Sequence, residues 1–90
     1  MEVDSDRIYK KIGSNVAKLR KARGLSQLDL AYCMGYSSVG FISAAEICSS
    51  SKHFNIEHLV KISTILECSL FELLEDVGTF EYITIKKNRL

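Results

Sequence analysis

A chain of 90 residues that is 47% hydrophobic and 26% charged is predicted to form one globular domain, not a disordered segment. Such a short chain cannot readily enclose a large active site, and it carries no phosphate-binding glycine loop, nucleophile motif or recognisable pair of catalytic carboxylates. We therefore expect a binding module, not an enzyme. The cysteines Cys33, Cys48 and Cys68 cannot all pair, their spacing fits no metal site, and no apolar run is long enough for a membrane span. We expect a cytoplasmic protein without a metal, cofactor or small-molecule ligand.

The charge of the chain is unevenly distributed, although its net value is only +1. Residues 7–23 hold seven basic residues and no acid, whereas residues 24–81 hold two basic residues against eight acids. A concentrated basic segment suits a polyanionic partner at one surface. The alternative is an ordinary solvated helix face.

Apolar residues at spacings of four, four and three predict a first helix that runs from Ser5 or Asp6 to Arg23. These residues are Ile8, Ile12, Val16 and Leu19. Gly24 follows them as a residue that readily adopts the left-handed conformation found after helix ends.

Two short helices are predicted next. Ser26 is a favourable N-cap for the first of them, and Asp29 stands three residues later, where its carboxylate completes a capping box. The second is expected over about 38–47, capped by Ser37 or Ser38.

Two more helices are predicted after a loop over residues 48–55. Asn55 is expected to start the first, whose apolar stripe comprises Leu59, Ile62 and Leu66. Ser69 is expected to cap the second, which ends before Gly78.

Residues 79–86 are rich in Thr, Ile and aromatic side chains, which favours a β-strand. One strand is not stable alone, and the sequence shows no second strand. We therefore predict an all-α fold over residues 1–78, followed by a short strand and basic tail over 79–90. The apolar residues near this strand exceed what a small domain needs, which suggests a homodimer. The expected contact residues are Phe71, Leu74, Phe80, Tyr82, Ile83 and Ile85.

One string covers most of the first three helices: I-G-S-N-V-A-K-L-R-K-A-R-G-L-S-Q-L-D-L-A from Ile12, then M-G-Y, then I-S-A-A-E. It is followed by N-I-E-H-L-V-K-I-S-T-I-L and F-E-L-L, which end at Leu74. This pattern resembles the Cro/C1-type (XRE-like) helix-turn-helix family, in particular phage Cro-like repressors and restriction–modification controller proteins. The resemblance implies a compact five-helix lambda-repressor-like domain. It also implies a transcriptional regulator that binds a near-palindromic operator in double-stranded DNA as a homodimer.

The resemblance also assigns roles to individual residues. The helix over 38–47 becomes the recognition helix in the major groove. Gln27 matches a glutamine that binds a DNA phosphate, and Lys21 and Lys52 are further phosphate contacts. Arg20 and Glu46 match an ion pair that ties the first helix to the third, with two unconnected surface charges as the alternative. The expected contacts around the recognition helix are Ser37, Ser38, Val39, Gly40, Phe41, Ser43 and Ala44.

The sequence departs from the family at the recognition helix. Its outward positions lack the Arg, Gln, Asn and Lys side chains that form bidentate contacts with bases. Specificity would then depend on apolar contacts and on DNA shape. Val39 and Phe41 have an alternative role as core or dimer residues. Cys48 stands where the family often has glycine, so a less sharply turned helix end is expected.

A second function remains open on the same fold. Because the predicted recognition helix has an apolar character and the net charge is nearly neutral, the chain is alternatively a protein-interaction module, such as an antitoxin-like partner or a subunit that has lost base reading.

Overall fold

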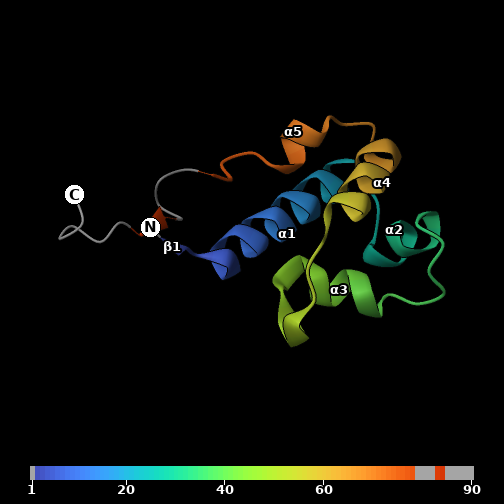
Figure 1. Ribbon diagram of the computed structural model, residues 1–90. Coiled ribbons are helices and arrows are strands. Elements are labelled where there is room, and N and C mark those ends of the chain that lie inside the picture. The colour runs from blue at the N-terminus through green and yellow to red at the C-terminus, as the bar shows by residue number, and fades with distance from the viewer. Residues whose placement is uncertain (1, 79–82, 85–90) are drawn as a thin grey trace.

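The computed structural model describes residues 2–78 and 83–84, and these residues contain five α-helices and two short strands. The helices are α1 (Ser5–Ala22), α2 (Gln27–Cys33), α3 (Gly40–Ile47), α4 (Ile56–Leu66) and α5 (Leu70–Leu73). A 3-10 turn, η1 (Ser49–Ser51), follows α3 within the expected loop. The strands are β1 (Glu2–Val3) and β2 (Ile83–Thr84), which lie at one end of α1 while α2 lies at the other (Figure 1). The prediction of a mostly helical chain is confirmed.

The long first helix begins and ends where local signals place it. The Asp4 side chain accepts a hydrogen bond from the Arg7 backbone N–H (3.2 Å), which satisfies one of the free amides at the helix start. Ala22 is the last helical residue, and Gly24 has a φ of +72°, as expected for a residue just after a helix. The predicted apolar face is buried at Ile12 and Val16.

Three of the helices in the described residues begin with a capping box. In α2 the Asp29 N–H donates to the Ser26 hydroxyl (3.0 Å), and the Ser26 N–H donates to the Asp29 carboxylate (2.9 Å). The hydrogen bond from the Ser26 backbone, and to a smaller extent the one with the Ser26 side chain, lowers the pKa of Asp29 below its ordinary value. Asn55 and Ser69 start α4 and α5 in the same way. All three predicted caps are confirmed.

The boundaries of α3 differ from the prediction. The helix begins at Gly40, and its N-cap is Val39, which makes no side-chain capping bond, so the expectation of a cap at Ser37 or Ser38 is wrong. The turn after α2 runs from residue 34 to residue 39, and within it Gly35 adopts a φ of +88° and the Tyr36 N–H bonds back to the Ala31 carbonyl (2.9 Å). At the other end Cys48 takes the left-handed conformation (φ 56°) although it is not glycine. The expectation of a less sharply turned helix end is therefore also wrong.

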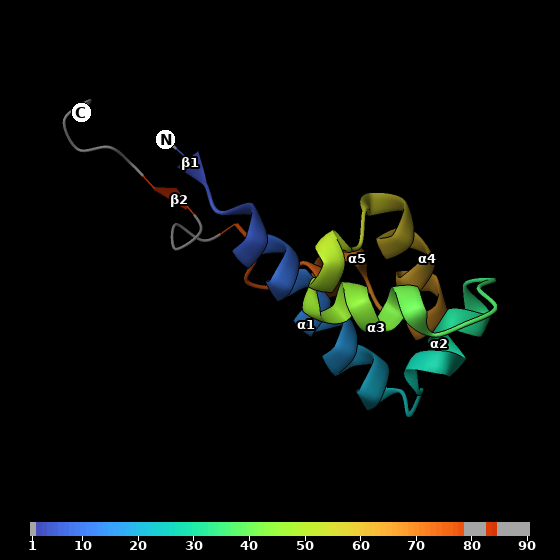
Figure 2. The same ribbon diagram turned by 90° about the horizontal axis from the view of Figure 1, so that it is seen from below.

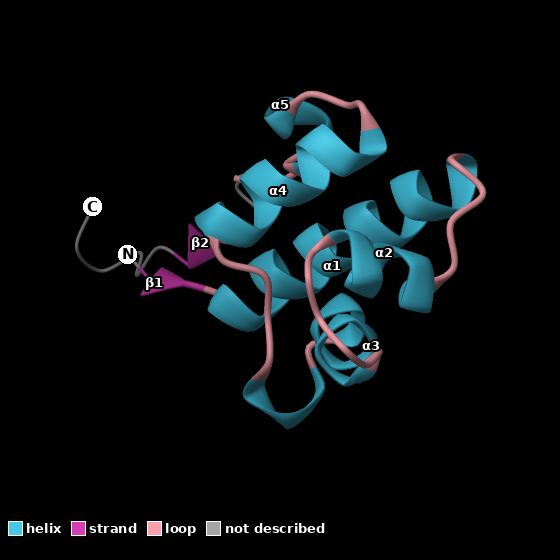
Figure 3. Cartoon of the chain, turned by 90° about the vertical axis from the view of Figure 1, so that its right-hand side faces the viewer, coloured by secondary structure: helices cyan, strands magenta, loops and turns pink. Residues whose placement is uncertain are grey.

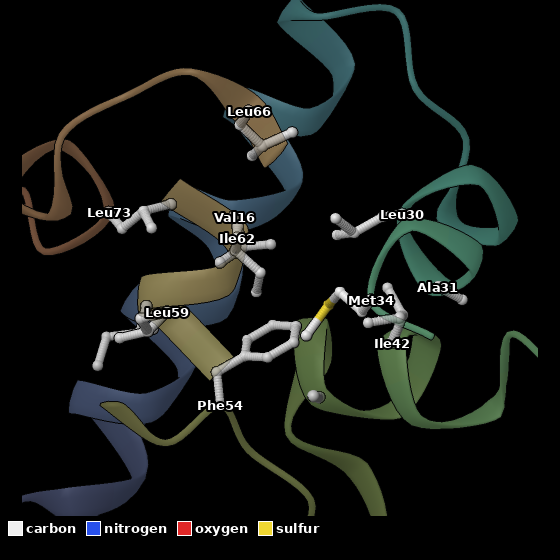
Figure 4. Close-up of a cluster of buried hydrophobic side chains, with 12 residues drawn as sticks. Val16, Leu30, Ala31, Met34, Ile42, Phe54, Leu59, Ile62, Leu66 and Leu73 are labelled. Atoms are coloured by element: carbon white, nitrogen blue, oxygen red, sulfur yellow. The ribbon is translucent and has the colours of Figure 1, made fainter. Parts of the chain in front are cut away.

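The core lies between all five helices of the described chain, as Figure 4 shows. Its largest fully buried side chains are Phe54, Leu30, Ile42, Leu59, Ile62, Leu66, Leu73 and Val16. The predicted stripe of α4 is therefore confirmed. Leu25 is only partly buried, and Leu28 on α2 is 40% exposed although both are apolar.

Helices α1 and α3 pack with their backbones in close approach at Gly13. A Cβ atom built on Gly13 would lie 2.8 Å from the Ala45 carbonyl oxygen and closer still to that of Glu46. In Figure 2, α3 lies across α1 at this contact. Only glycine lets the two helices approach this closely, because any side chain at this position would meet backbone atoms of α3.

The predicted C-terminal strand has a partner in the same chain. β2 pairs antiparallel with β1, with Glu2 opposite Thr84 and Val3 opposite Ile83. The sequence showed no second strand because β1 is only two residues long, and two residues show no alternation that a sequence pattern can detect. Residues 79–82 and 85–90 of the predicted strand and tail lie outside the described residues.

Candidate nucleic-acid interface

Helices α2 and α3 pack against each other across a turn that runs from Met34 to Val39. Ala31 on α2 and Ala45 on α3 are both fully buried, so small side chains allow the two helices to come close together. Figure 3 shows α3 nearly end-on, below α1 and α2. The inner side of α3 is thus fixed to the protein, and its remaining residues face outward.

A buried ion pair fastens α3 to α1. The Arg20 Nε donates to Glu46 Oε2 at 2.8 Å, and Arg20 Nη2 donates to Glu46 Oε1 at 3.1 Å. Arg20 also donates from Nη1 to the Leu25 carbonyl (2.8 Å), and both charged residues are only 6% exposed. Such a bidentate pair fixes the relative orientation of the two helices. The ion pair that the family resemblance implied is present, and the alternative of two unconnected charges is wrong.

Gln27, the first residue of α2, joins the same network. Its Nε2 donates to Glu46 Oε1 at 2.8 Å, so one carboxylate oxygen accepts from both Arg20 and Gln27. From the sequence, Gln27 was predicted to bind a DNA phosphate, and its bond to Glu46 was not predicted. In the structure the side chain connects α2 to α3, and its amide nitrogen is already engaged.

The residues around the start of α3 that point away from the core have short side chains, and they are exposed or partly buried. Ser37, Ser38 and Gly40 are exposed, whereas Val39, Ser43 and Ala44 are partly buried. The Ser43 hydroxyl donates to the Gly40 carbonyl (3.1 Å), and Glu46 is the one acid among residues 34–56. Since Glu46 is buried in the ion pair, the outward surface of α3 carries no acidic side chain.

Two residues of α3 are placed differently from the sequence prediction. The Phe41 ring lies in an aromatic cluster, with its centroid 5.6 Å from Tyr36, 5.8 Å from Phe54 and 4.7 Å from His58. This packing supports the alternative that Phe41 is a core residue, and we no longer expect it to contact a base. Ile47, an apolar residue at the end of the predicted helix, is 68% exposed, because its spacing of five residues from buried Ile42 places it on another face of the helix.

The basic residues divide into exposed ones and ones engaged within the protein. Lys21 and Lys52 are exposed, as their predicted role in phosphate binding requires. Arg23, in contrast, donates from Nη2 to the Glu67 carbonyl (2.9 Å) and ties the end of α1 to the end of α4. His53 stacks on Tyr9 with 3.8 Å between ring centroids.

Lys18 lines a separate hollow with Glu72 and Glu75 beside α5. Asn15, which the sequence analysis missed, lines the same hollow and is buried. Its Nδ2 donates to the carbonyls of Leu73 and Glu75, both at 2.9 Å. The available signal was a polar residue on the apolar face of α1, one position before Val16. Asn15 thus ties the end of α5 to α1.

The residues predicted to form a dimer contact are only partly placed. Phe71 on α5 is 83% exposed, whereas Leu74 packs partly buried against the core. Ile83 belongs to β2, and its backbone lies opposite Val3. Phe80, Tyr82 and Ile85 lie outside the described residues. Phe71 is therefore the one exposed apolar side chain of this set for which the structure gives a position.

The cysteines and acidic residues of the described chain form no further site. Among residues 2–78 and 83–84, no three His, Cys, Asp or Glu side chains gather closely enough to hold a metal ion. Cys33, Cys48 and Cys68 are free, and burial raises the pKa of the Cys48 and Cys68 thiols. No helix in the described part of the chain is both long and apolar enough to cross a membrane.

Comparison of the chain with protein-family models, with curated proteins and with solved structures finds no match.

Proposed function

We propose that α2, the turn over 34–39 and α3 form a helix-turn-helix unit of the Cro/C1 type, and that the chain binds double-stranded DNA through α3. The observation that carries this proposal is the contrast between the two sides of α3. Its inner side is fixed by Ile42, Ala45 and the Arg20–Glu46 ion pair, while its outward residues Gly40, Ser43 and Ala44 have short side chains that carry no acid. A rigid helix with such a surface can enter the major groove without repulsion from phosphates.

Base recognition in this proposal depends on small side chains. Ser38 and Ser43 carry hydroxyl groups that bond to bases or phosphates, and Val39 and Ala44 offer methyl groups to thymine. None of these residues makes a bidentate contact, so sequence-dependent DNA shape supplies part of the specificity. Lys21 and Lys52 are the proposed phosphate contacts.

The functional unit in this proposal is a homodimer that regulates transcription. A two-fold axis would place two α3 helices about 34 Å apart, one helical turn of DNA, on a near-palindromic operator. Exposed Phe71 is the proposed contact residue. The Gln27 bond to Glu46 adds a role within the protein, because it fixes the start of α2 relative to α3.

Fluorescence anisotropy tests DNA binding directly, with a labelled duplex from upstream of the chain's own gene and random duplex as competitor, at two salt concentrations. Selective binding supports the proposal. Lys21→Ala is expected to weaken binding to all sequences and to lower the slope of log K against log salt by about 0.9, the value for one lost phosphate contact. Lys61→Ala on α4 removes the same charge and is the matched control, for which the slope stays unchanged.

A second pair of variants tests the α3 surface. Ser38→Glu introduces a negative charge at an exposed position beside the start of α3 and is expected to abolish binding through repulsion from phosphates. Thr64→Glu makes the same change in charge at an exposed position of α4 and is expected to have little effect. Equal losses in the two variants would contradict the assignment of α3 to the interface.

The second candidate function is a protein-interaction module. Ile47, which is 68% exposed on α3, and the absence of a long polar side chain around the start of this helix favour it. Absence of DNA binding at both salt concentrations would decide for this alternative.

A further inference from the structure

The capping box of α4 contains a histidine in place of the usual acid or amide. The His58 N–H donates to Asn55 Oδ1 (2.8 Å), and the Asn55 N–H donates to His58 Nδ1 (3.0 Å). Glu and Gln are the ordinary residues at this third helical position, and their oxygen atoms accept a hydrogen bond from the N-cap across the neutral pH range. An imidazole nitrogen accepts this bond only while it is unprotonated.

The same imidazole ring packs against α3. Its centroid lies 4.7 Å from that of Phe41 and 6.2 Å from that of Phe54, which is buried. Phe41 in turn contacts Tyr36 in the turn before α3. One side chain therefore closes the start of α4 and supports the residue that anchors the beginning of α3.

Protonation of His58 would disturb both contacts. In the imidazolium ion both ring nitrogens are donors, so the Asn55 N–H would lose its acceptor and face another N–H group. The added positive charge would also lie in the first turn of α4, where the helix dipole already disfavours a cation. The side chain would have to rotate away from Asn55 and thereby change its contact with Phe41.

The charged groups around His58 favour its neutral form on balance. Burial is the largest cause that lowers its pKa, followed by Lys61, while His53 in the preceding loop acts in the same direction and Glu57 opposes them. From α3 the ring meets Phe41, which carries no charge. His58 therefore binds a proton less readily in the folded protein than in the unfolded chain, where the pKa of histidine is about 6.5. Its contribution to the free energy of unfolding is complete above that pH and decreases as the pH falls below it.

We propose that His58 is a pH-sensitive latch that holds the start of α3 against α4 when neutral and releases it when protonated. Protonation of His58 would then loosen the Phe41 cluster before the rest of the fold is lost, and because the pKa of His58 is lowered in the folded protein, this happens at a more acidic pH than the ordinary titration of a histidine. Its consequence for DNA binding rests on the function proposed above, but the latch itself is a property of the protein alone.

Thermal unfolding without DNA tests the latch. Between pH 7.5 and pH 5.5 we expect the Tm of the wild-type protein to fall by about 3 °C. His58→Gln keeps an acceptor for the Asn55 N–H and does not titrate, so its Tm should change by less than about 1 °C over the same range. His53→Gln is the matched control; it removes only the smallest of the causes that lower the pKa of His58 and should retain most of the wild-type loss. An equal loss in wild type and His58→Gln, or no loss in wild type, would overturn the proposal.

A second measurement uses the wild-type protein alone and does not depend on how well the variants fold. In an NMR titration, the ring protons of Phe41 and the amides at the start of α3 should shift with the same midpoint as the His58 ring. Shifts confined to His58 and its neighbours on α4 would refute the latch. A chain that shows the latch but binds no DNA would contradict the proposed function and leave this inference intact.

Discussion

Replacement of Gly13 by alanine tests how closely α1 and α3 pack. Gly13 lies in the interior of α1, where exchange of glycine for alanine ordinarily stabilises a helix by about 0.5–1 kcal/mol. At this position the new methyl carbon would lie 2.8 Å or less from two carbonyl oxygens of α3. These are backbone atoms, so no side-chain rotation relieves the overlap, and α3 itself must move.

The expected result is a destabilisation, opposite in sign to the effect of helix propensity. Overpacking of this kind costs about 1–3 kcal/mol, and the propensity gain offsets only part of it. We expect a net loss of about 1–2 kcal/mol and a fall in Tm of roughly 5–10 °C, measured by circular dichroism during heating.

The neighbouring residue provides the control for this prediction. Ser14 is exposed on the same helix, so Ser14→Ala gains helix propensity without meeting α3 and should leave stability unchanged or slightly higher. If Gly13→Ala stabilised the protein as Ser14→Ala does, the close approach of α1 and α3 would be incorrect. The argument that packing against α1 fixes the position of α3 would then fail.

Three further substitutions probe the contacts around the proposed interface. Glu46→Ala leaves the buried Arg20 charge without its partner and should cost about 3–5 kcal/mol in urea unfolding; a loss below about 1 kcal/mol would indicate an exposed pair. Phe41→Ala should lower the free energy of unfolding by about 2–3 kcal/mol, since the Phe41 ring is partly buried. Unchanged stability together with an altered operator preference would indicate that Phe41 contacts DNA. Asn15→Ala removes the donor for the carbonyls of Leu73 in α5 and of Glu75 just after it, and should cost about 1–3 kcal/mol, with faster amide exchange confined to α5 and the residues that follow it; uniform protection would contradict this role.

Features that depend on neighbouring residues could be predicted from the sequence. The caps at Ser26, Asn55 and Ser69 require only a suitable side chain and a partner three residues later, and all three form. The buried faces of α1 and α4 likewise follow from helical spacing alone. Local hydrogen bonding and periodicity therefore account for the correct part of the predicted fold.

Features that depend on distant residues were missed. The bond from Gln27 to Glu46 spans nineteen positions, and the contact of Phe41 with His58 joins two helices whose relative placement no periodicity specifies. The start of α3 was misplaced because serine is a favourable cap in general, whereas here Val39 occupies the N-cap without a side-chain bond. The Arg20–Glu46 pair was anticipated because a family resemblance supplied the distant partner, not because its geometry could be derived.

The pairing of β1 with β2 has a consequence for the order of folding. Contact between Val3 and Ile83 closes a ring that contains nearly the whole chain, and the entropy lost in closing a ring grows with the logarithm of its length. The two residue pairs between β1 and β2 offset little of this entropy loss, because a two-stranded ribbon is only marginally stable. The ribbon should therefore form after the helices have packed and brought its strands together, so substitutions in it should change the unfolding rate more than the folding rate.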